Sequence, residues 1–420
     1  MKFLYNIGIR AYGLGVMTAG LLGNSKAIKW VEGRRNWKDQ LKQIKWNQPV
    51  WIHASSLGEF EQAKPLIEKI KKTTDEEIIV TFFSPSGYDY CKDYPHADGV
   101  FYIPLDTSRN AKSFLEIVNP KIAIFVKYDF WFNFLKVLQQ QKTPILFFSS
   151  NFRPGQVYFK KTTQWQRNIM KKIDFIYCMN EESASILRKF IFENVGVCGD
   201  TRFDRVSQNA SSCVPIPLIE KFKGSERLLI LGSSWPIEEE ILAKYLQKNI
   251  PDDLKIIIAP HDISEDHLVE IESLFERGMV RFSKVNETQI TNFKILLIDN
   301  IGMLANCYQY GDFAFVGGGF TNSLHNILEA ASMGNVLLYG DVVSKYPEGQ
   351  QLKDVGGSFL LKGETHFAEV MNQLLTDKAL VSTMSDKAKL FVNEHQGATD
   401  KVFEKAMELM VILPETLLNR

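Results

Sequence analysis

Short apolar runs alternate with amphipathic segments along most of the chain, and this alternation constrains the fold more than any other feature. The amphipathic segments carry apolar residues at the helical repeat of about 3.6 positions, as in Phe60, Ala63 and Ile67. An alternation of strands and helices predicts an α/β fold whose mainly parallel sheets carry helices on both faces. Ligands bind such folds at the carboxyl ends of the strands. The runs expected to form strands are 49–55, 78–83, 100–104, 122–126, 145–148, 176–179, 195–198, 228–231, 256–259, 295–298, 313–316, 336–339 and 359–361.

The alternation is interrupted once, and the interruption divides the chain into two similar halves. Residues 207–217 are rich in Ser, Asn and Pro and have no apolar periodicity, which is typical of a linker. A length of 420 residues also exceeds that of a single small domain. We therefore expect a basic and apolar segment at 1–45, an N-terminal Rossmann-like domain at 46–206, a linker at 207–225, a C-terminal Rossmann-like domain at 226–398 and a closing helix at 399–420.

Composition excludes several classes of protein. Lys and Arg total 49 and Asp and Glu total 49, so no excess of positive charge is available for DNA or RNA as a main partner. The 5 cysteines are scattered without the close spacing of a zinc or redox pair, which favours reduced packing residues. A hydrophobic share of 45% is that of an ordinary globular protein.

The first 45 residues depart from this neutrality. They hold nine basic residues against Glu32 and Asp39, and the uncharged stretch 11–25 is shorter than the roughly 20 apolar residues of a spanning helix. The stretch lacks a convincing cleavage site, so we expect it to be retained. Apolar residues followed by lysines, arginines, Trp30 and Trp37 favour an element in the interface of an anionic membrane. The alternative is a helical hairpin packed on its own domain.

Two motifs in the first half follow expected strands and carry acidic residues. In Ile52-His-Ala-Ser-Ser-Leu-Gly-Glu59, Ser56 and Glu59 have the spacing of a capping box, which alone would account for both residues. The position of Glu59 in the first turn after a strand also suits a general base at the edge of the sheet. In Phe125-Val-Lys-Tyr-Asp-Phe-Trp-Phe-Asn133, Asp129 by itself is more typical of a cap or turn.

Two motifs in the second half are typical of phosphate and ribose sites. Leu231-Gly-Ser-Ser-Trp-Pro-Ile-Glu238 leads from a strand into a helix, so Ser233 and Ser234 are candidate phosphate donors. Three glycines follow Phe315-Val316 and allow close approach of a ligand to the backbone, and Glu329 is a candidate acceptor for ribose hydroxyls. Helix capping without a ligand is the alternative for these residues.

Taken in order, the motifs resemble those of the Kdo transferases of lipopolysaccharide synthesis. The resemblance rests on Ala54-Ser-Ser-Leu-Gly-Glu59, Asp129-Phe-Trp-Phe-Asn133, Gly199-Asp-Thr-Arg-Phe-Asp204, Gly232-Ser-Ser234 and His325-Asn-Ile-Leu-Glu329. It implies a GT-B fold, with two Rossmann-like domains facing across a cleft and a membrane-associating N-terminal segment. It also implies an inverting transfer of 3-deoxy-D-manno-oct-2-ulosonic acid (Kdo) from CMP-Kdo to the lipid A precursor, at the cytoplasmic face of the inner membrane of a Gram-negative bacterium.

The resemblance assigns roles by position. Glu59 matches the catalytic base and Asp129 a second acidic residue, whereas Lys127 and Phe132 stand where the family has an acid and a proline. We expect the acceptor to contact Ser56, Gly58 and Arg153. The expected donor-binding residues are Arg202, which replaces a lysine, together with Ser233, Ser234, Pro260, His261, Gly318, Gly319, Asn326 and Glu329.

We expect neither a metal ion nor another cofactor. The chain has no Asp-x-Asp pair, and a CMP-sugar carries a single phosphate that a helix N-terminus and cations suffice to stabilise. Two other functions remain open: a different GT-B enzyme, such as a UDP-sugar transferase or epimerase, and a non-catalytic relative that binds nucleotide or lipid. The altered Lys127 and Phe132 favour the second of these.

Overall fold

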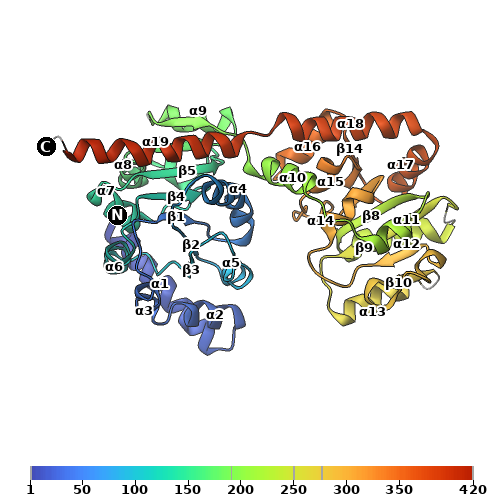
Figure 1. Ribbon diagram of the computed structural model, residues 1–420, viewed down its shortest axis with the longest axis horizontal. Helices are drawn as coiled ribbons and strands as arrows, with labels where there is room; N and C mark the ends of the chain where they lie inside the picture. The colour runs from blue at the N-terminus through green and yellow to red at the C-terminus, as the bar shows by residue number, and fades with distance from the viewer. Residues whose placement is uncertain (1, 191, 249–250, 276–277, 419–420) are drawn as a thin grey trace. The chain divides into compact units, whose positions relative to one another are not determined.

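The computed structural model describes residues 2–190, 192–248, 251–275 and 278–418, and these form two compact units (Figure 1). Unit 1 comprises residues 1–205 and 396–420, and unit 2 comprises residues 206–395. Each unit is built around one parallel sheet with helices, which confirms the predicted α/β fold. The boundary near residue 205 lies next to the expected one, but the chain returns to unit 1 after residue 395.

The sheet of unit 1 has seven parallel strands in the order β3-β2-β1-β4-β5-β6-β7. Every predicted apolar run of the first half forms one of them, because buried parallel strands need apolar side chains on both faces. The central strands β1, β2 and β4 are buried along their whole length. The bounds are β1 Val50–His53, β2 Ile78–Phe82, β3 Gly99–Tyr102, β4 Ile122–Val126, β5 Ile145–Ser150, β6 Phe175–Cys178 and β7 Val195–Val197.

The sheet of unit 2 also has seven parallel strands, in the order β10-β11-β9-β8-β12-β13-β14. The six predicted strands are present, and β10 is an addition that the sequence analysis missed. It has three residues at the edge of the sheet, too few for a recognisable pattern. The bounds are β8 Arg227–Ser234, β9 Leu254–Pro260, β10 Met279–Arg281, β11 Ile295–Leu297, β12 Phe313–Val316, β13 Val336–Gly340 and β14 Ser358–Leu361.

Helices connect the strands in both units. Those of unit 1 are α1 Lys2–Leu21, α2 Ser25–Gly33, α3 Trp37–Lys42, α4 Leu57–Thr73, α5 Pro85–Cys91, α6 Ser108–Val118, α7 Phe132–Gln141, α8 Gln164–Met170, α9 Glu181–Lys189 and α19 Ala398–Leu418, with 3-10 turns at Val157–Phe159 and Lys161–Thr163. Those of unit 2 are α11 Pro217–Lys223, α12 Pro236–Lys248, α13 Glu265–Leu274, α14 Leu304–Cys307, α15 Leu328–Met333, α16 Pro347–Asp354, α17 Glu364–Thr376 and α18 Lys378–Glu394, with 3-10 turns at Phe282–Lys284, Ile290–Asn292 and Tyr308–Tyr310.

The segment expected to be a linker is mostly helical. Helix α10 (Thr201–Ser211) runs through the boundary between the units, and α11 follows with Pro217 in its first turn. Buried Phe203 and Val206 anchor α10, so tertiary packing overrides the weak helix propensity of its Ser and Asn residues. Only residues 212–216 and 224–225 of the expected linker lie outside the two helices.

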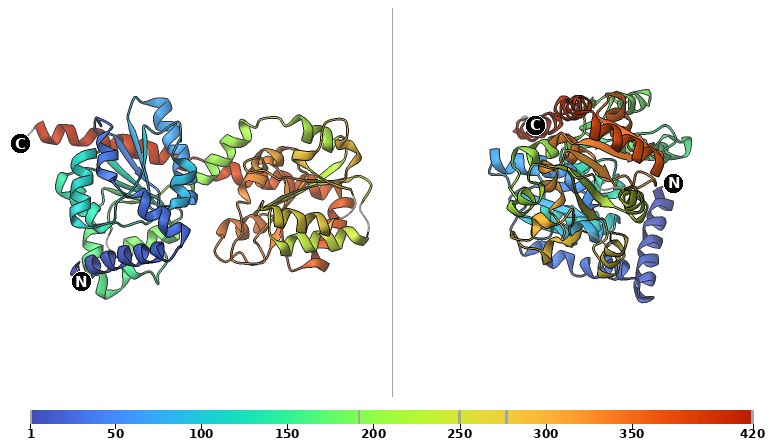
Figure 2. Two further views of the ribbon diagram at one scale, coloured as in Figure 1. Left: turned by 90° about the horizontal axis from the view of Figure 1, so that it is seen from below. Right: turned by 90° about the vertical axis from the view of Figure 1, so that its right-hand side faces the viewer.

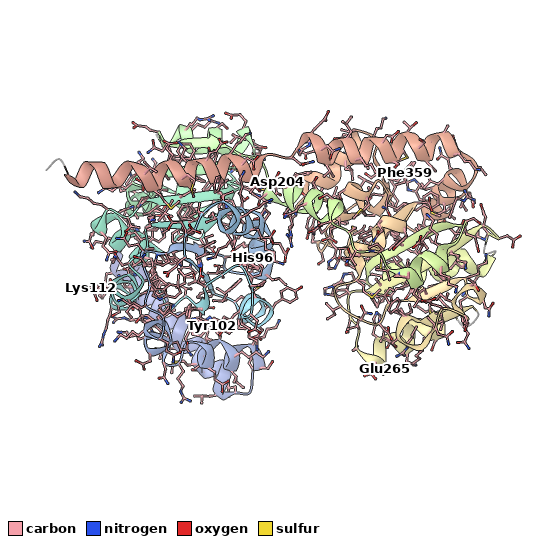
Figure 3. All side chains as sticks on the ribbon, in the orientation of Figure 1. His96, Tyr102, Lys112, Asp204, Glu265 and Phe359 are labelled. Atoms are coloured by element: carbon pink, nitrogen blue, oxygen red, sulfur yellow. The ribbon has the colours of Figure 1, made fainter. Side chains whose placement is uncertain are left out.

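The C-terminal helix α19 belongs to the core of unit 1. Its Val402 and Ala406 are fully buried in the same apolar cluster as Phe60 of α4. Asp204, labelled in Figure 3, holds the start of α19, since its carboxylate accepts hydrogen bonds from the backbone N–H groups of Gly397 and Thr399 at 2.6 and 2.7 Å. The outgoing and returning segments of the chain are therefore joined at one carboxylate.

The N-terminal helix α1 lies along the outside of unit 1 (Figure 2). The Tyr5 hydroxyl donates a hydrogen bond of 2.5 Å to the buried carboxylate of Asp106. That carboxylate also accepts from the first backbone N–H groups of α7, including Asn133 at 3.1 Å. Other apolar side chains of α1 face solvent, among them Phe3, Leu4, Ile7, Leu14, Met17 and Leu21. Within the described ranges, no helix combines the length and the apolar character needed to cross a bilayer.

Candidate active site

Each sheet has a switch point at its first strand, where the connections on either side run in opposite directions. In unit 1, β1 lies between β2 and β4, and in unit 2, β8 lies between β9 and β12. Loops leave such a switch point to opposite sides and open a crevice at the carboxyl ends of the strands. Most of the predicted site residues lie at or just after the carboxyl ends of β1, β4, β8, β9 and β12, so the topology brings them to one edge of their own sheet. Arg153 follows β5 and Arg202 follows β7.

Glu59 stands in the first turn of α4, directly after β1. Its Oε2 accepts a hydrogen bond of 2.6 Å from the backbone N–H of Ser55, one residue before the position that a capping box requires. The Ser56 side chain makes no capping bond either, so the capping box considered as an alternative does not form. Burial, followed by the negative charge of Asp129, raises the pKa of Glu59 to about 7. A carboxyl group with this pKa exchanges protons readily near neutral pH.

Asp129 lies in the loop after β4 with its side chain 24% exposed. Burial raises the pKa of its carboxyl, and its Oδ2 has no hydrogen-bond partner among the described residues. Lys127 stands two residues earlier with a φ of 62°, a left-handed conformation that is strained for a lysine. Its positive charge lowers the pKa values of both carboxyl groups, which opposes the effect of burial.

His53, at the end of β1, contacts these loops and was not among the residues predicted from the sequence. Its Nδ1 hydrogen-bonds with Thr81 Oγ1 at 2.8 Å, and its Nε2 accepts from Trp131 Nε1 at 2.9 Å. Burial lowers the pKa of His53 to about 3, so the imidazole is neutral. Its position at the end of an apolar strand is typical of a core residue. Trp131, two residues after Asp129, was a possible signal, because its indole N–H needs an acceptor in this region.

The other predicted residues of unit 1 are less closely grouped. Gly58 is exposed, with open space where a Cβ would lie, and Arg153 is exposed in the loop after β5. Arg202, predicted to bind the donor, lies in unit 1 rather than in unit 2 with the other donor residues. Its Nε donates to the buried carboxylate of Asp200 at 2.7 Å. Asp200 also accepts from Gln62, so this cation is held by an internal anion.

In unit 2, the predicted phosphate turn is occupied by acidic side chains from the following helix. Ser233 takes a left-handed conformation with a φ of 51°. The Ser234 hydroxyl is buried and donates to Glu239 Oε1 at 2.7 Å. Buried Glu238 accepts from the N–H of Gly318 at 2.9 Å. Ser234 and Gly318 therefore already have hydrogen-bond acceptors within the protein.

The glycine run after β12 is required by packing. A Cβ at Gly319 would lie 2.4 Å from the backbone nitrogen of Gly340, and a Cβ at Gly318 would lie 2.1 Å from the carbonyl oxygen of Ser323. Gly318 also has a φ of 83°, which favours glycine. The absence of side chains here lets three backbone segments meet at the carboxyl edge of the sheet.

Three aromatic rings form a stack at the same edge. The ring centroids of Trp235 and His261 are 4.5 Å apart, and those of His261 and His325 are 4.7 Å apart. Pro260 pairs with Ser234 in the sheet and places His261, whose backbone N–H donates to the Ser234 carbonyl at 3.0 Å. Burial lowers the pKa of His325 to about 4. Such rings offer a stacking surface for a planar ligand.

Asn326 and Glu329 follow at the start of α15. Asn326 Nδ2 donates to Glu329 Oε1 at 3.0 Å, and Asn326 Oδ1 accepts from the N–H of Leu328 at 3.2 Å. Asn326 is exposed, so its pairing with Glu329 lies at the surface. Across the described residues, no group of three or more His, Cys, Asp or Glu side chains is arranged to hold a metal ion.

Comparison with known proteins identifies relatives. A family model described as 3-deoxy-D-manno-octulosonic-acid transferase (kdotransferase) matches residues 31–205. The 3-deoxy-D-manno-octulosonic acid transferase of Aquifex aeolicus (strain VF5) is 27% identical over 347 residues, which are 81% of this chain and 89% of that protein. The protein of the same name from Chlamydophila psittaci is 24% identical over 370 residues, or 84% of each chain. A crystal structure of UDP-N-acetylglucosamine 2-epimerase has a TM-score of 0.60 at 16% identity, covering 87% of this chain and 96% of that one.

The relatives and the two parallel-sheet units define the class of the protein as glycosyltransferase. Within that class, the chain is a relative of the Kdo transferases, and the resemblance of the sequence motifs is confirmed. The similarity to the epimerase concerns the fold alone.

Proposed function

We propose that this chain transfers Kdo from CMP-Kdo to the lipid A precursor, with inversion at the anomeric carbon. The single observation that carries the proposal is the half-buried Glu59 beside Asp129 in a chain related to Kdo transferases over 81% of its length. The two units would work as a GT-B pair, with the acceptor on unit 1 and the donor on unit 2.

In this mechanism Glu59 is the general base. Its carboxylate takes the proton of the acceptor hydroxyl as that oxygen bonds to the anomeric carbon, and CMP leaves with the electron pair of the broken bond. A pKa of about 7 suits a base at neutral pH, and a positioned base contributes roughly 10² to 10⁴ in rate. Lys127 keeps a larger fraction of the base ionised, because its charge opposes the effect of Asp129.

The donor would bind at the carboxyl edge of the unit 2 sheet. The rings of Trp235, His261 and His325 would stack on the cytosine base. Glu329 would accept hydrogen bonds from the ribose hydroxyls, and the Asn326 amide would donate to the phosphate. We propose the backbone around Ser233 and Gly319 as the surface that the phosphate approaches. Catalysis requires the bound donor to reach Glu59.

We further propose that the protein acts at the cytoplasmic face of the inner membrane and contacts the bilayer through α1. The exposed apolar residues of α1 and the surplus of basic residues in the first 45 positions support an interfacial position. To test it, Phe3, Leu4 and Ile7 are changed together to Gln, and binding to anionic vesicles is measured by flotation. Binding should fall, whereas Leu390→Gln, an exposed leucine of unit 2, should have no effect. Equal binding by both variants would contradict the interfacial position.

The activity is tested by incubating the purified full chain with CMP-Kdo and lipid A precursor and weighing the product by mass spectrometry. A product heavier by one or more Kdo residues, with release of CMP, is the expected result. Turnover of a UDP-sugar instead would favour another GT-B enzyme. CMP binding without turnover, even in a membrane extract that contains acceptor, would favour the non-catalytic alternative.

A further inference from the structure

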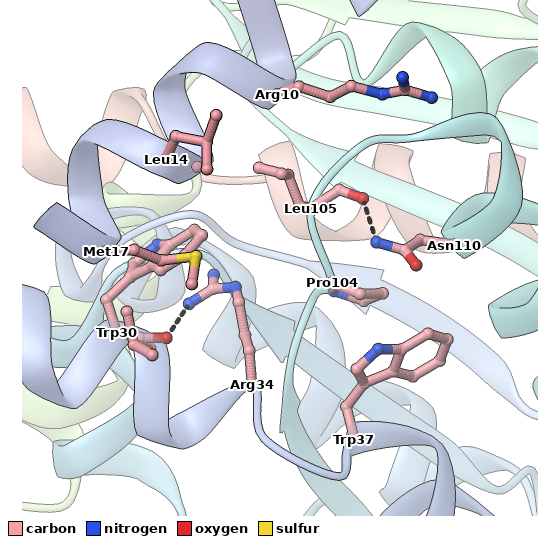
Figure 4. A pocket seen from close by; sticks show the side chains of 11 residues that line it. Arg10, Leu14, Met17, Trp30, Arg34, Trp37, Pro104, Leu105 and Asn110 are labelled. Atoms are coloured by element: carbon pink, nitrogen blue, oxygen red, sulfur yellow. Dashed lines mark hydrogen bonds between the residues drawn. The ribbon is translucent and has the colours of Figure 1, made fainter.

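A pocket of about 480 Å³ lies in unit 1 between α1, α2 and the segment after β3 (Figure 4). Leu14 and Met17 of α1 form one side, Trp30 of α2 forms another, and Pro104 and Leu105 complete the lining. Its wall is apolar, and its volume falls within the range of roughly 300–1,000 Å³ that is usual for ligand sites. Leu14 and Met17 are 65% and 51% exposed although they line it, so the pocket is open along α1.

Arg34 stands in this pocket without an acidic partner. Its guanidinium donates hydrogen bonds to three backbone carbonyl groups, those of Ile103, Trp30 and Phe83, at 2.7 to 3.1 Å. The guanidinium carbon lies 3.9 Å from the centroid of the Trp30 ring. Among the described residues, no carboxylate forms an ion pair with Arg34, and burial lowers the pKa of Arg34 to about 9. A charge in apolar surroundings without a counter-ion is costly, and an anionic ligand would reduce that cost.

The surroundings of the pocket are also positive. A second hollow of about 440 Å³ shares Met17, Val31 and Arg34 with the pocket. The residues that line the two include Arg10, Arg34 and Arg35 but one acidic side chain, Glu32. An apolar cavity with basic residues around it is complementary to a molecule that has both a hydrocarbon chain and a negative group.

The pocket is one side chain away from the candidate catalytic loop. Phe83, which follows β2, packs against Trp30 with a centroid distance of 5.7 Å. The same ring lies 4.9 Å from that of Trp131, the residue that donates to His53 beside Asp129. An amphiphile with its chain in the pocket would therefore have its head group near the carboxyl edge of the unit 1 sheet.

We infer that this pocket binds one acyl chain of the acceptor, an acylated sugar phosphate, with Arg34 and Arg10 contacting its negative group. The inference rests on the proposed function for the identity of the acceptor and adds a subsite for its chain. It commits to the acceptor rather than to bulk phospholipid, because the pocket is joined to the candidate catalytic loop by the ring contacts of Trp30, Phe83 and Trp131.

The probe for the test is dodecyl phosphate, titrated calorimetrically into the purified full chain below its micelle-forming concentration. One molecule should bind per chain, dodecyl maltoside should bind more weakly because it lacks the charge, and inorganic phosphate should not bind. Octyl phosphate should bind about a hundredfold more weakly, since each CH₂ group withdrawn from water contributes a similar increment. Equal binding of the phosphate and the maltoside would overturn the role of the arginines.

Variants locate the site. Val31→Trp fills the pocket and should weaken dodecyl phosphate binding by about tenfold or more. Arg10→Gln should weaken it by about two- to fivefold, as expected for an exposed charge. Arg34→Gln also removes the hydrogen bonds to three carbonyl groups, and the variant can fail to fold for that reason. Val31→Trp and Arg10→Gln test the site without that loss. Leu390→Trp and Lys244→Gln in unit 2 are the matched controls, and Val31→Trp with unchanged affinity would overturn the inference.

Competition distinguishes the source of the chain. Lipid A precursor should displace dodecyl phosphate, and Val31→Trp should raise the KM for that acceptor more than the KM for CMP-Kdo. Displacement by phosphatidylglycerol vesicles as effective as that by the acceptor would overturn the inference in favour of bulk lipid. Absence of any transfer from CMP-Kdo would refute the proposed function while probe binding still tests the pocket, whereas transfer by a chain that binds no probe would refute the pocket alone.

Discussion

In both units, acidic side chains follow strands near the switch point, but the two sets have different partners. In unit 2, Glu238 and Glu239 are buried and accept hydrogen bonds from Gly318 and Ser234. In unit 1, Asp129 has a carboxylate oxygen without a hydrogen-bond partner among the described residues, and Glu59 has the charge of Asp129 nearby. Carboxylates whose hydrogen bonds are all made within the protein fix the backbone. Two neighbouring carboxyl groups that lack some of these hydrogen bonds can exchange a proton. The comparison supports the proposal that the proton transfer takes place on unit 1, whereas Glu238 and Glu239 of unit 2 hold backbone and side-chain groups in place.

The largest effect is expected at Glu59. Glu59→Gln removes the proton acceptor and should lower kcat by roughly 10² to 10⁴, or about 3 to 5 kcal/mol of barrier. Mass-spectrometric counting of transferred Kdo over time gives the rate. Glu61→Gln, two residues further along α4 and paired with Lys64, is the matched control and should retain activity. Equal rates for wild type and Glu59→Gln would place the base elsewhere.

Glycine substitutions should separate packing in unit 2 from function in unit 1. Gly319→Ala places a Cβ 2.4 Å from the backbone of Gly340 and should lower the free energy of unfolding by about 1–3 kcal/mol. Gly58→Ala meets nothing within 4 Å and should leave stability unchanged or slightly raised. Urea denaturation measures both. Comparable destabilisation by the two changes would contradict the packing argument, and a loss of activity in a stable Gly58→Ala would support its contact with the acceptor.

The third effect is a change in the pH dependence of stability. His53 has a pKa of about 3 in the folded protein against 6.5 ordinarily, so between these values the unfolded chain binds a proton that the folded chain does not. Stability is therefore lost as the pH falls through this window, by up to about 1.4 kcal/mol per pH unit. His53→Gln removes this contribution, so its stability should fall less steeply than that of the wild type between about pH 6.5 and 4.5. Parallel curves from urea denaturation would show that folding does not lower the pKa of His53.

The smallest effect is a displacement of the pH–rate profile. Asp129 raises the pKa of Glu59 and Lys127 lowers it. Asp129→Asn should therefore move the acidic limb of the kcat profile to lower pH, and Lys127→Met should move it to higher pH. The residual activity of each variant is sufficient for the measurement, because only the midpoint of the limb is compared. If the acidic limb moved in the same direction in both variants, the titrating group would not be Glu59.

The sequence predicted the parts of the molecule that depend on local pattern. All predicted apolar runs form strands, and Glu59, Asp129 and the glycines do follow strand ends, because β-branched runs and helix starts are local signals. Ser233, expected in a turn, lies in the last residues of β8. Strand β10 was too short to recognise. The helical course of residues 207–211 depends on burial of Phe203, which local composition does not reveal.

The contacts that were not predicted from the sequence depend on packing between segments far apart in the chain. His53 meets Trp131 across 78 positions, and Trp235 meets His325 across 90. The pairing of Ser234 with Glu239 also changes the interpretation of a turn that looked ready for phosphate. The pocket beside α1 requires three segments of unit 1 to meet. Such contacts leave no periodic trace in the sequence.

The position of α19 has a consequence for how the protein matures. Val402 and Ala406 complete the apolar interior against α4, yet they follow the whole of unit 2 in the chain. During synthesis, unit 2 can fold as soon as it leaves the ribosome, whereas the face of the sheet around β1 and β4 stays incompletely covered until these residues arrive. Unit 1, which holds the candidate base, is thus the last to complete its core. A chain that lacks α19 would have a folded unit 2 but an incomplete unit 1.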